Sequence, residues 1–399
     1  MAVCPILSVV VPVHNASRQL ACCLQALQSS RCRDFELLVV DDCSTDSTPQ
    51  VIHFHGARYI RTPHRIGPAG ARNLGARHAR GRILVFVDAD VQVPPEALDL
   101  IAGNFARDPQ LAAVFGSYDQ APAQPDFFSQ YKNLVHHYVH QHSHENTASF
   151  WTGCGAIRKD LFEEFRGFNV GQYPRPAIED IELGHRLRAS GHKVLLDKRL
   201  QVKHLKRWTL AGMLKSDIRD RAVPWSKLIL NNGEIPRDLN LTYAARFSAA
   251  GTMLLAVLAL ALSLSARMPR TSVLLLACGS LATVLALISL NYGVYGFLWK
   301  RRGFAFAVTA MPIHWLYYFY SGLVWVGCWT AHHLGVAFRS PSMARAGQLQ
   351  RLGPQTPCNG SASDSQGTIS EGQFREEEVL LPDGLEPPAS AEPPRIKIA

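Results

Sequence analysis

The chain has 399 residues and a formal net charge of +9, and its positive charge is concentrated before Ser340, because the residues beyond contain five Lys or Arg against eight Asp or Glu. A basic body of this kind suits a phosphate-bearing substrate or an anionic membrane surface. No zinc-finger spacing, ribonucleoprotein-type aromatic signature or long basic run is present, which argues against nucleic acid as a partner. The nine scattered cysteines are never spaced as Cys-x-x-Cys, which argues against a disulfide framework or structural zinc and for a reducing compartment.

Strand and helix patterns alternate through the first quarter of the chain. Residues 1–5 lead directly into the first strand without the regions of a signal peptide, so we expect none. Apolar runs predict strands over 6–13, 35–42, 57–61 and 83–87, and apolar spacing predicts helices over 18–29 and 67–80. Thr48-Pro49 is typical of an N-cap followed by the first helical residue. This alternation predicts a mostly parallel sheet in a three-layer α/β sandwich.

Carboxylates close two of these strands. The strand over 83–87 runs into Asp88-Ala89-Asp90, and the strand over 35–42 finishes in Asp41-Asp42. Open α/β sheets bind their ligands at the carboxyl ends of strands. Two acids one residue apart suit a hard divalent cation that bridges to phosphate oxygens, the alternative being a simple acidic turn. A glycine-rich turn over 67–73 brings Arg72 to the same edge, where helix amides and a guanidinium favour an anion.

Four segments in this order resemble the inverting family-two glycosyltransferases of the GT-A fold: Val11-Pro12-Val13-His14-Asn15, Asp41-Asp42-Cys43-Ser44-Thr45-Asp46-Ser47-Thr48, Gly70-Ala71-Arg72-Asn73-x-Gly75 and Asp88-Ala89-Asp90. The resemblance implies that Asp42 and Arg72 contact the nucleotide base and that Asp88 reaches the ribose. It also implies that Asp90, with Asp88 as a second candidate, binds Mg²⁺ or Mn²⁺ on the diphosphate. Further donor-binding candidates are Pro12, His14, Asn15, Asp41 and Ser44. Cys43 stands where the family commonly has glycine, so positive φ is less accessible there.

Two later segments could line the site. Residues 126–145 predict a helix rich in histidine, in which His136 and His140 lie one turn apart and could share a metal. We favour a solvated or lipid-facing surface, or contacts to an acceptor phosphate. The strand predicted over 150–158 contains Gly153, and its small residues let a ligand approach the backbone. In the family, such a segment lines the donor sugar and acceptor; a packed glycine-rich strand is the alternative.

Glu179 and Asp180 open a helix predicted to end near Gly191. Acids in a first turn stabilise the helix dipole, but transfer with inversion also needs a carboxylate that takes a proton from the acceptor hydroxyl. By the match with the family's Glu-Asp motif, Asp180 is the base and Glu179 the second choice. His204-Leu205-Lys206-Arg207-Trp208 is similar to the Gln-x-x-Arg-Trp box of processive polysaccharide synthases, with histidine in place of glutamine. The similarity makes Arg207 a diphosphate clamp and Trp208 an acceptor platform, against the alternative of a surface basic cluster.

The second half of the chain carries membrane signals. Residues 209–240 predict an amphipathic helix that lies on a membrane surface or packs on the catalytic domain. The region 241–338 contains apolar stretches over 247–266, 273–298 and 304–334, each long enough to cross about 30 Å of hydrocarbon. Lys300-Arg301-Arg302 indicates a cytoplasmic second connection. Residues 339–399 are rich in Pro, Gly, Ser and Glu, and predict a disordered tail.

The sequence therefore predicts a GT-A nucleotide-sugar transferase domain over residues 1–208, an interfacial region, three transmembrane helices and a tail. The resemblance implies a hexosyltransferase of the cell inner membrane, with its catalytic domain in the cytoplasm. It would move sugar from a UDP- or GDP-sugar to a lipid-linked or glycan acceptor in cell-envelope glycan biosynthesis. The alternatives are a non-catalytic nucleotide-sugar-binding scaffold and a processive polysaccharide synthase. A sugar-phosphate nucleotidyltransferase is disfavoured, because residues 12–17 lack the glycine-rich, Arg-containing loop which that class needs.

Overall fold

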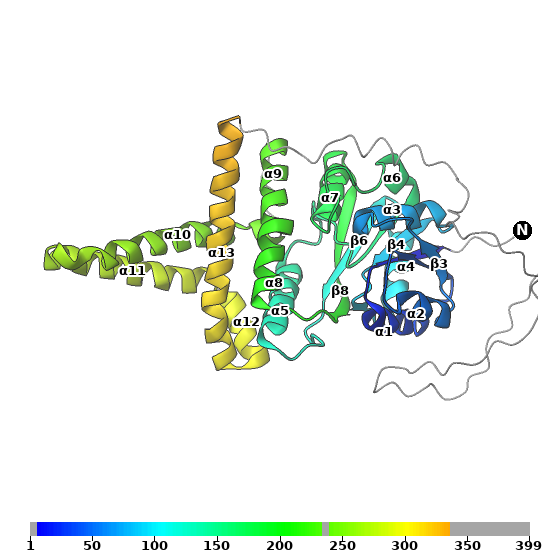
Figure 1. Ribbon diagram of the computed structural model, residues 1–399, viewed down its shortest axis with the longest axis horizontal. Helices are drawn as coiled ribbons and strands as arrows, with labels where there is room; N and C mark the ends of the chain where they lie inside the picture. The colour runs from blue at the N-terminus through cyan, green and yellow to red at the C-terminus, as the bar shows by residue number, and fades with distance from the viewer. Residues whose placement is uncertain (1–5, 234–238, 336–399) are drawn as a thin grey trace, which may run out of the picture. The chain divides into compact units, whose positions relative to one another are not determined.

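Eight strands form one sheet in the order β3-β2-β1-β4-β7-β6-β8-β5, in a computed structural model that describes residues 6–233 and 239–335 (Figure 1). The strands are β1 (Leu7–Val13), β2 (Phe35–Asp41), β3 (Arg58–Arg61), β4 (Ile83–Val87), β5 (Val91–Gln92), β6 (Leu111–Tyr118), β7 (Cys154–Arg158) and β8 (Lys193–His204). Strands β1 to β4 are mutually parallel, as predicted. Strand β7 runs antiparallel to β4 and β6, and β5 runs antiparallel to β8, so the sheet as a whole is mixed.

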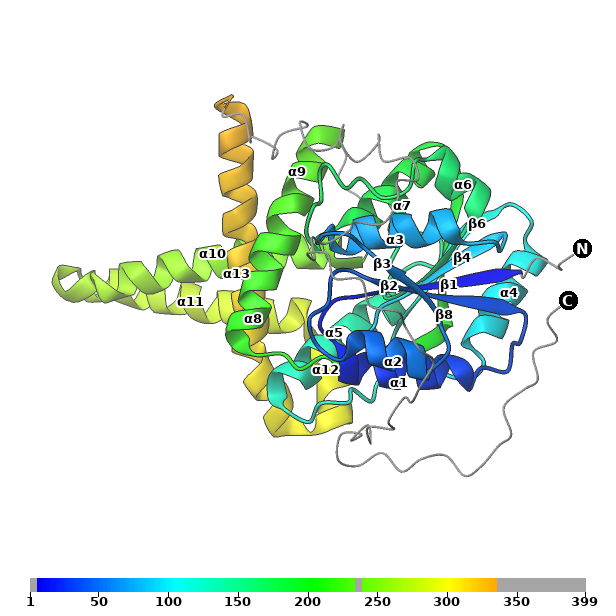
Figure 2. The same ribbon diagram turned by 45° about the vertical axis from the view of Figure 1, so that its right-hand side comes forward.

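Helices cover both faces of the sheet and give the predicted three layers (Figures 1 and 2). One face packs against α1 (Ser17–Gln28), α2 (Thr48–Phe54) and α4 (Ala97–Arg107). The other face packs against α3 (Gly67–His78), α6 (Lys159–Glu164) and α7 (Glu179–Ala189). Helix α5 (Phe127–His142) lies against β6 and β8. The start of α2 differs from the prediction, because Ser47 rather than Thr48 occupies the N-cap position.

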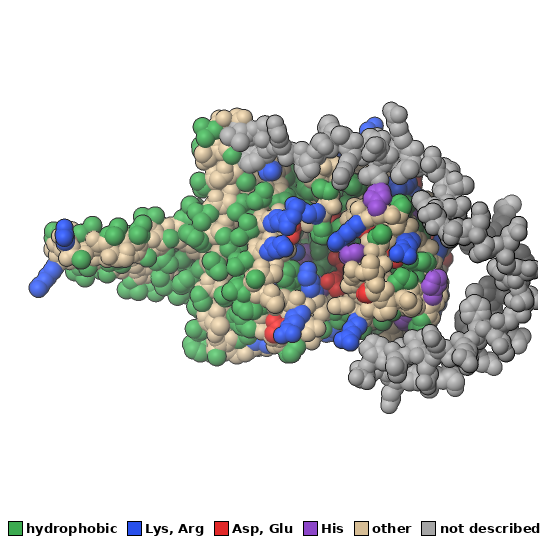
Figure 3. Space-filling view, in the orientation of Figure 1, with side chains coloured by type: hydrophobic (Ala, Val, Ile, Leu, Met, Phe, Trp, Pro, Cys, Tyr) green, Lys and Arg blue, Asp and Glu red, His purple; other side chains and the backbone are tan. Residues whose placement is uncertain are grey.

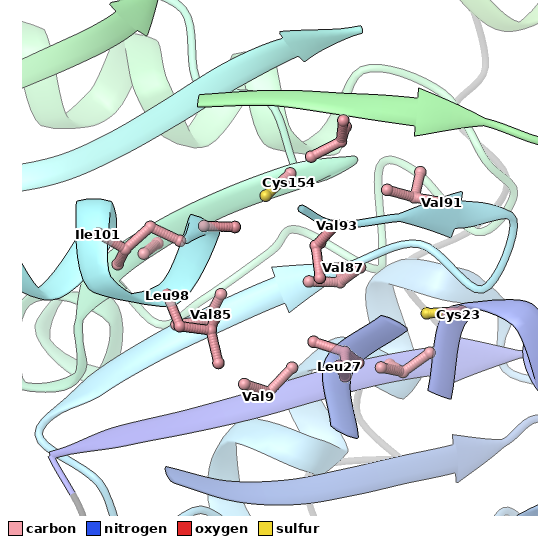
Figure 4. Close-up of a cluster of buried hydrophobic side chains, with 14 of the residues drawn as sticks. Val9, Cys23, Leu27, Val85, Val87, Val91, Val93, Leu98, Ile101 and Cys154 are labelled. Carbon is pink, nitrogen blue, oxygen red and sulfur yellow. The ribbon is translucent and has the colours of Figure 1, made fainter. Parts of the chain in front are cut away.

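The core between β1, β4, α1 and α4 is built from branched aliphatic side chains. Val9, Leu27, Val85, Leu98 and Ile101 are fully buried and interdigitate there (Figure 4). Burying one such side chain contributes about 1.5–3 kcal/mol. This packing fixes the strands whose ends carry the acids.

Strand register brings these ends together. In the β1–β2 pair, Val13 lies beside Asp41, and in the β1–β4 pair, Val10 lies beside Phe86. Strand β7 enters beside β4 in the opposite direction, so that the Asp88 backbone N–H reaches the Gly153 carbonyl (3.3 Å). The carboxyl ends of β1, β2 and β4 and the amino end of β7 thus share one edge.

The predicted amphipathic helix is a continuous helical run with a change of pitch. It comprises α8 (Leu210–Lys215), the π-helical segment η1 (Ser216–Ala222) and α9 (Val223–Asn232). Pro224 explains the change of pitch in η1, because proline lacks an N–H and its ring clashes with the carbonyl four residues earlier. Single π-helical turns are frequent at functional sites.

The remaining helices are α10 (Tyr243–Ser263), α11 (Arg270–Leu290), α12 (Tyr292–Arg302) and α13 (Phe304–His333), with short 3-10 turns at Leu239–Leu241 and Ser265–Arg267. Helices α10 and α11 pack side by side as a hairpin, and α13 lies across them (Figures 1 and 2). Among the described residues, α10 and α11 are the two helices long and apolar enough to cross a membrane.

Two of the predicted spans need correction. The stretch over 273–298 is not one helix: α11 ends at Leu290, and the Asn291 amide donates to Ser248 Oγ and to the Leu287 carbonyl (2.9 Å each) before α12 begins. The stretch over 304–334 is helical nearly throughout, but α13 carries several Tyr, Trp and His side chains and is not among the described helices whose hydropathy suits a membrane span. The tail predicted over 339–399 and the signal-peptide prediction at 1–5 lie outside the described residues.

Candidate active site

A cavity of about 1780 Å³ opens at the edge of the sheet where the strand ends meet. The predicted site residues on its wall are Pro12, His14, Asp42, Arg72, Asp88, Asp90, Glu179, Asp180, Arg207 and Trp208. The same cavity continues along α5, η1, α9, α10 and α13. One continuous, partly open cavity therefore joins the sheet edge to the apolar helices.

Arg72 joins two carboxylates that are far apart in the sequence. Its guanidinium donates to Asp88 Oδ1 (2.6 Å) and to Glu179 Oε1 (2.9 Å). Burial raises the pKa of both Asp88 and Glu179, and the charge of Arg72 opposes that shift. Arg72 and Glu179 side chains are each 5% exposed, whereas Asp88 is 31% exposed. The triad therefore locks the amino end of α7 onto the end of β4 and leaves Asp88 accessible.

The two acids that begin α7 have different surroundings. Both carboxylate oxygens of Glu179 accept hydrogen bonds within the protein, because Oε1 accepts from Arg72 and Oε2 accepts from the Ala177 backbone N–H (2.9 Å). Asp180 is half-buried and lines the cavity. Thr152 donates its backbone N–H and its hydroxyl to Asp180 Oδ2 (3.0 Å each), which fixes this carboxylate beside the start of β7. Of the pair, Asp180 is the one that a ligand in the cavity can reach.

Asp90 lies beside a histidine that the β5–β8 pairing supplies. Val91 faces His204 across this antiparallel pair, and the Leu205 backbone N–H donates to the Asp90 carbonyl (2.8 Å). His204 Nε2 lies 3.6 Å from Asp90 Oδ2. His204 Nδ1 lies 3.0 Å from Asn133 Oδ1, so Asn133 fixes the orientation of the imidazole. A carboxylate oxygen and an imidazole nitrogen thus converge beyond the carboxyl end of β4.

Four predicted donor-binding residues do not line the cavity in the described part of the chain: Asn15, Asp41, Ser44 and Gly153. The first three hold the turns after β1 and β2. Asp41 Oδ1 accepts from the Ser44 N–H (2.8 Å), and Ser44 Oγ accepts from the Asn15 N–H (2.9 Å). Between them, Cys43 adopts a φ of +66°, the conformation for which glycine is the usual choice.

Gly153 also differs from its expected role. A Cβ on Gly153 would lie 2.1 Å from the Trp151 ring, so the space that glycine leaves is filled by this indole rather than by a ligand. Trp151 itself lines the cavity. Gly153 therefore leaves room for the Trp151 indole, which forms part of the cavity wall.

Asp42 lines the cavity, but both of its oxygens serve the loop before α3. Oδ1 accepts from the Thr62 hydroxyl (3.0 Å) and the Ile66 N–H (2.8 Å), and Oδ2 accepts from the Gly67 N–H (2.8 Å). These amides begin α3 and have no partner within the helix. Asp42 therefore holds the turn that delivers Arg72.

The histidine-rich helix α5 contributes an aromatic wall. The rings of His136 and His140 lie 3.9 Å apart, and His136 also packs against Tyr118 and Trp151. His140 Nδ1 donates to the Gly116 carbonyl (3.1 Å). Burial lowers the pKa of His140 to about 4 and that of His136 well below its ordinary value, so both rings are neutral at pH 7. Among the described residues, no group of three or more His, Cys, Asp or Glu side chains could hold a metal ion unaided.

The segment after β8 is split between surface and core. The Arg207 side chain is 74% exposed, and its Nε lies 3.7 Å from Asp126 Oδ2. Trp208 is 7% exposed and packs with Tyr131, Leu134 and Leu298. The Lys206 ammonium lies over the Trp208 ring, 4.2 Å from its centroid. Sequence patterns did not predict that His204 lies beside Asp90, because that contact depends on strand pairing. They also did not predict that Lys206 lies over Trp208, because that contact depends on long-range packing.

Comparison with known proteins finds a family model that matches the first part of the chain. The family model for Glycosyl transferase family 2 matches residues 8–166. This segment is a glycosyl transferase family 2 domain. The family match ends before Glu179, Asp180 and the segment 204–208, so those residues rest on the structure alone.

Curated relatives of this glycosyl transferase domain include chondroitin synthase of Escherichia coli, 29% identical over 115 residues, and poly(ribitol-phosphate) beta-glucosyltransferase of Bacillus spizizenii, 33% identical over 118 residues. Each match covers 28% of this chain but only 17% and 18% of the respective relative. Among solved structures, the mannosyltransferase PcManGT of Pyrobaculum calidifontis in complex with GDP-Man and Mn²⁺ superposes with a TM-score of 0.53 at 22% identity. That likeness covers 79% of this chain and 88% of PcManGT, and it shows a shared fold.

Proposed function

We propose that this protein is a membrane-anchored, metal-dependent, inverting glycosyltransferase that moves a sugar from a UDP- or GDP-sugar to a lipid-linked acceptor. The observation that carries the proposal is the single cavity that joins Asp88, Asp90 and Asp180 to the walls of α10 and α13. The acidic end suits a nucleotide sugar, and the apolar end suits a lipid chain. PcManGT, with GDP-Man and Mn²⁺ bound, supports this choice of donor class.

Asp180 is proposed as the base. The Thr152 backbone and hydroxyl fix its position, and it lines the cavity. It would accept the proton of an acceptor hydroxyl as that oxygen bonds to the sugar, while the nucleoside diphosphate leaves from the opposite side. Glu179 is unsuited to this task, because Arg72 and the Ala177 N–H occupy its two oxygens. Arg207, exposed at the rim, would bind the leaving diphosphate.

The donor set at Asp90 fits Mg²⁺ or Mn²⁺. Asp90 offers a carboxylate oxygen, His204 offers Nε2, and Asn133 orients the imidazole from its other side. Asp88, one residue away along the strand end, is a further oxygen ligand. So few protein ligands would leave positions open for diphosphate oxygens. When bound, the ion neutralises charge that develops on the leaving diphosphate.

The membrane anchor is proposed to be the α10–α11 hairpin. Leu254, Val257, Leu275 and Leu281 on these helices are each at least half exposed, a surface that favours lipid over water. Each helix has 21 residues and so is about 31 Å long, enough to cross the hydrocarbon core. The tip, with Arg267 and Arg270, would then lie on the far side of a bacterial inner membrane, with the catalytic domain in the cytoplasm.

Helix α13 is proposed to lie along the membrane surface rather than to cross it. It runs across the hairpin in Figures 1 and 2. One face is tied to the catalytic part, because Tyr320 donates to Asp217 Oδ2 (2.8 Å) and Tyr131 lies 2.8 Å from His314 Nδ1. Its exposed apolar side chains, including Leu316, Leu323 and Val326, suit the headgroup boundary. Two spans would place both ends of the hairpin on the catalytic side.

The test incubates the detergent-extracted full chain with UDP-glucose, UDP-GlcNAc and GDP-mannose in Mn²⁺, with and without a membrane lipid extract, and measures nucleoside diphosphate release. We expect release with one donor class, its loss in excess chelator, and its loss in Asp90→Asn. Asp160→Asn, an exposed acid on α6, is the matched control. Full activity of Asp90→Asn or in excess chelator would contradict the metal role, and no release with any donor would contradict the function.

A further inference from the structure

Between its acidic end and its apolar end, the cavity passes a wall with an excess of positive charge. Side chains of α5, the 206–207 segment, α8 and η1 place five cations and two carboxylates on this wall: Lys132, Lys206, Arg207, Lys215, Arg221, Asp217 and Asp220. Figure 3 shows Lys and Arg side chains gathered on the face where the long helices meet the α/β domain. The excess raises the question of which anion belongs there.

One carboxylate of this wall is already engaged. Asp217 is 3% exposed and accepts from the Lys132 ammonium (2.5 and 2.6 Å) and from the Tyr320 hydroxyl (2.8 Å). Lys206 lies over the Trp208 ring, and neither Lys206 nor Arg221 forms an ion pair within 4 Å in the described part of the chain. Lys206 and Arg221 on this wall thus have no ion-pair partner among residues 6–233 and 239–335.

These cations lie close enough to act on one another. Burial lowers the pKa of Lys132 to about 8. The positive charges of Arg221 and Lys206 also lower this pKa, whereas the negative charge of Asp217 raises it. The charge of Arg221 also acts to lower the pKa values of Tyr118 and His136, which line the sheet side of the cavity. The charge of Lys206 acts to lower the pKa of Asp90. Lys132 and Lys206 both lie over the Trp208 ring, 5.9 and 4.2 Å from its centroid, and together with Arg221 they line the same cavity as the acids of the site.

Apolar side chains continue the cavity beyond this cluster. Ile229 on α9, Met253 on α10, and Trp325 and Val326 on α13 line it there. Within residues 6–233 and 239–335, α10 is one of the two helices apolar enough to cross a membrane, so this end of the cavity adjoins the proposed lipid phase. A ligand that fills the passage needs an anionic group followed by an apolar chain.

We propose that Lys206 and Arg221, supported by Lys132, form a subsite for the phosphate of a lipid phosphate, whose hydrocarbon chain lies between α9, α10 and α13. The inference rests on the proposed function and deepens it, because it names the phosphate of the acceptor lipid as a group that the enzyme recognises. Guanidinium and ammonium groups bind phosphate oxygens through charge-assisted hydrogen bonds. The phosphate would anchor the acceptor lipid, and a hydroxyl on the head group that this phosphate carries would give its proton to Asp180 as its oxygen bonds to the sugar.

The experiment measures binding to the full-length protein in neutral detergent by tryptophan fluorescence, with geranylgeranyl monophosphate, geranylgeraniol and inorganic phosphate as probes. We expect the lipid phosphate to bind at least tenfold more tightly than the alcohol, and inorganic phosphate not to compete at equal concentration. The double variant Lys206→Gln/Arg221→Gln should lose about 10- to 100-fold in lipid phosphate affinity and little in alcohol affinity. Arg219→Gln, on the same π-helical segment but outside the cavity wall, should bind like the parent.

Three results would overturn the inference. Equal binding of alcohol and phosphate would mean an apolar groove without a phosphate subsite, and competition by inorganic phosphate would mean a site for a soluble anion. An equal loss in Arg219→Gln would mean that bulk charge, not the cluster, attracts the lipid. Titration of each sample with the donor nucleotide and Mn²⁺ serves as the fold control. Retained nucleotide binding with no phosphate preference refutes the subsite alone, whereas absent nucleotide binding in the parent refutes the proposed function.

Discussion

The sheet edge and the cationic wall formed by α5, the 206–207 segment, α8 and η1 (the helical wall) are stabilised in different ways. At the sheet edge, each acid that shapes the site has its partner inside the protein: Asp42 in the loop before α3, Glu179 on Arg72, and Asp180 on Thr152. On the helical wall, Lys206 and Arg221 form no ion pair in the described residues. The sheet edge is therefore preorganised before any ligand arrives, whereas the helical wall combines one internal ion pair, Lys132 with Asp217, with two cations that we propose bind an anion of the acceptor. The difference is the reason for proposing chemistry at the first region and acceptor recognition at the second.

The largest expected effect concerns catalysis at the sheet edge. In Asp180→Asn, the side-chain carbonyl can still accept the hydrogen bonds from Thr152, but the side chain can no longer act as a base. Nucleotide-sugar turnover should fall about 10²- to 10⁴-fold, with donor binding unchanged. Steady-state release of nucleoside diphosphate and equilibrium donor binding measure the two quantities. Turnover within threefold of the parent would show that Asp180 is not the base, and would contradict the assignment of chemistry to the sheet edge.

The next effect concerns the stability of the helical wall. Asp217→Ala leaves Lys132 buried without its partner and deprives Tyr320 of its acceptor. Removing one member of a buried ion pair costs about 3–5 kcal/mol of unfolding free energy. Denaturant unfolding of the detergent-solubilised protein measures it. Asp220→Ala, on the same segment and without an ion pair in the described part of the chain, is the control and should change stability by well under half of that amount.

A pH dependence should come from α5. The pKa of His140 is about 4 in the folded protein against an ordinary value of 6.5, because the ring is buried. Between pH 6.5 and pH 4 the unfolded chain takes up a proton that the folded protein does not. The free energy of unfolding therefore falls as the pH is lowered through this window, by about 3 kcal/mol for this one group.

His140→Gln should remove that part of the dependence, because glutamine can still donate to the Gly116 carbonyl but does not titrate. Unfolding at a series of pH values compares variant and parent. Parallel curves for the two proteins between pH 6.5 and pH 4 would show that His140 is not a buried neutral ring.

The smallest effect concerns the turn that delivers Arg72. Gly67 has a φ of +78°, and a Cβ there would lie 2.6 Å from the Pro174 carbonyl oxygen. Gly67→Ala should cost about 1–3 kcal/mol, part from the backbone conformation and part from the clash. Gly56→Ala isolates the first part, because Gly56 has a φ of +63° and no atom within 4 Å of its Cβ position. Equal losses in the two variants would show that the contact with Pro174 is dispensable.

Sequence patterns predicted the sheet edge well, because local rules govern it. Apolar runs that end in acids marked β2 and β4, and parallel pairing then had to place Asp42 and Asp88 at one edge. The glycine-rich turn likewise predicted the position of Arg72. What the residues do there was harder to predict: Asp42 holds a loop, and Cys43 takes a positive φ that its residue type disfavours.

The helical wall could not be read from the sequence in the same way. Lys132 lies on α5, Lys206 in the segment after β8 and Arg221 on η1, and no spacing rule links them. The contact of His204 with Asp90 depends on the two-residue strand β5, which is too short for any periodicity. The break at Asn291 is also tertiary in origin, because its side chain is held by Ser248 on α10 and by the Tyr318 hydroxyl on α13.

The most direct test of the account follows radiolabelled sugar from its nucleotide donor into the organic-solvent extract of a reaction containing full-length protein, Mn²⁺ and membrane lipids. The account predicts label in the lipid fraction, one nucleoside diphosphate released for each sugar transferred, and loss of both in Asp180→Asn. Label that appears only as free sugar in the aqueous phase, or that enters lipid equally well with Asp180→Asn, would contradict it.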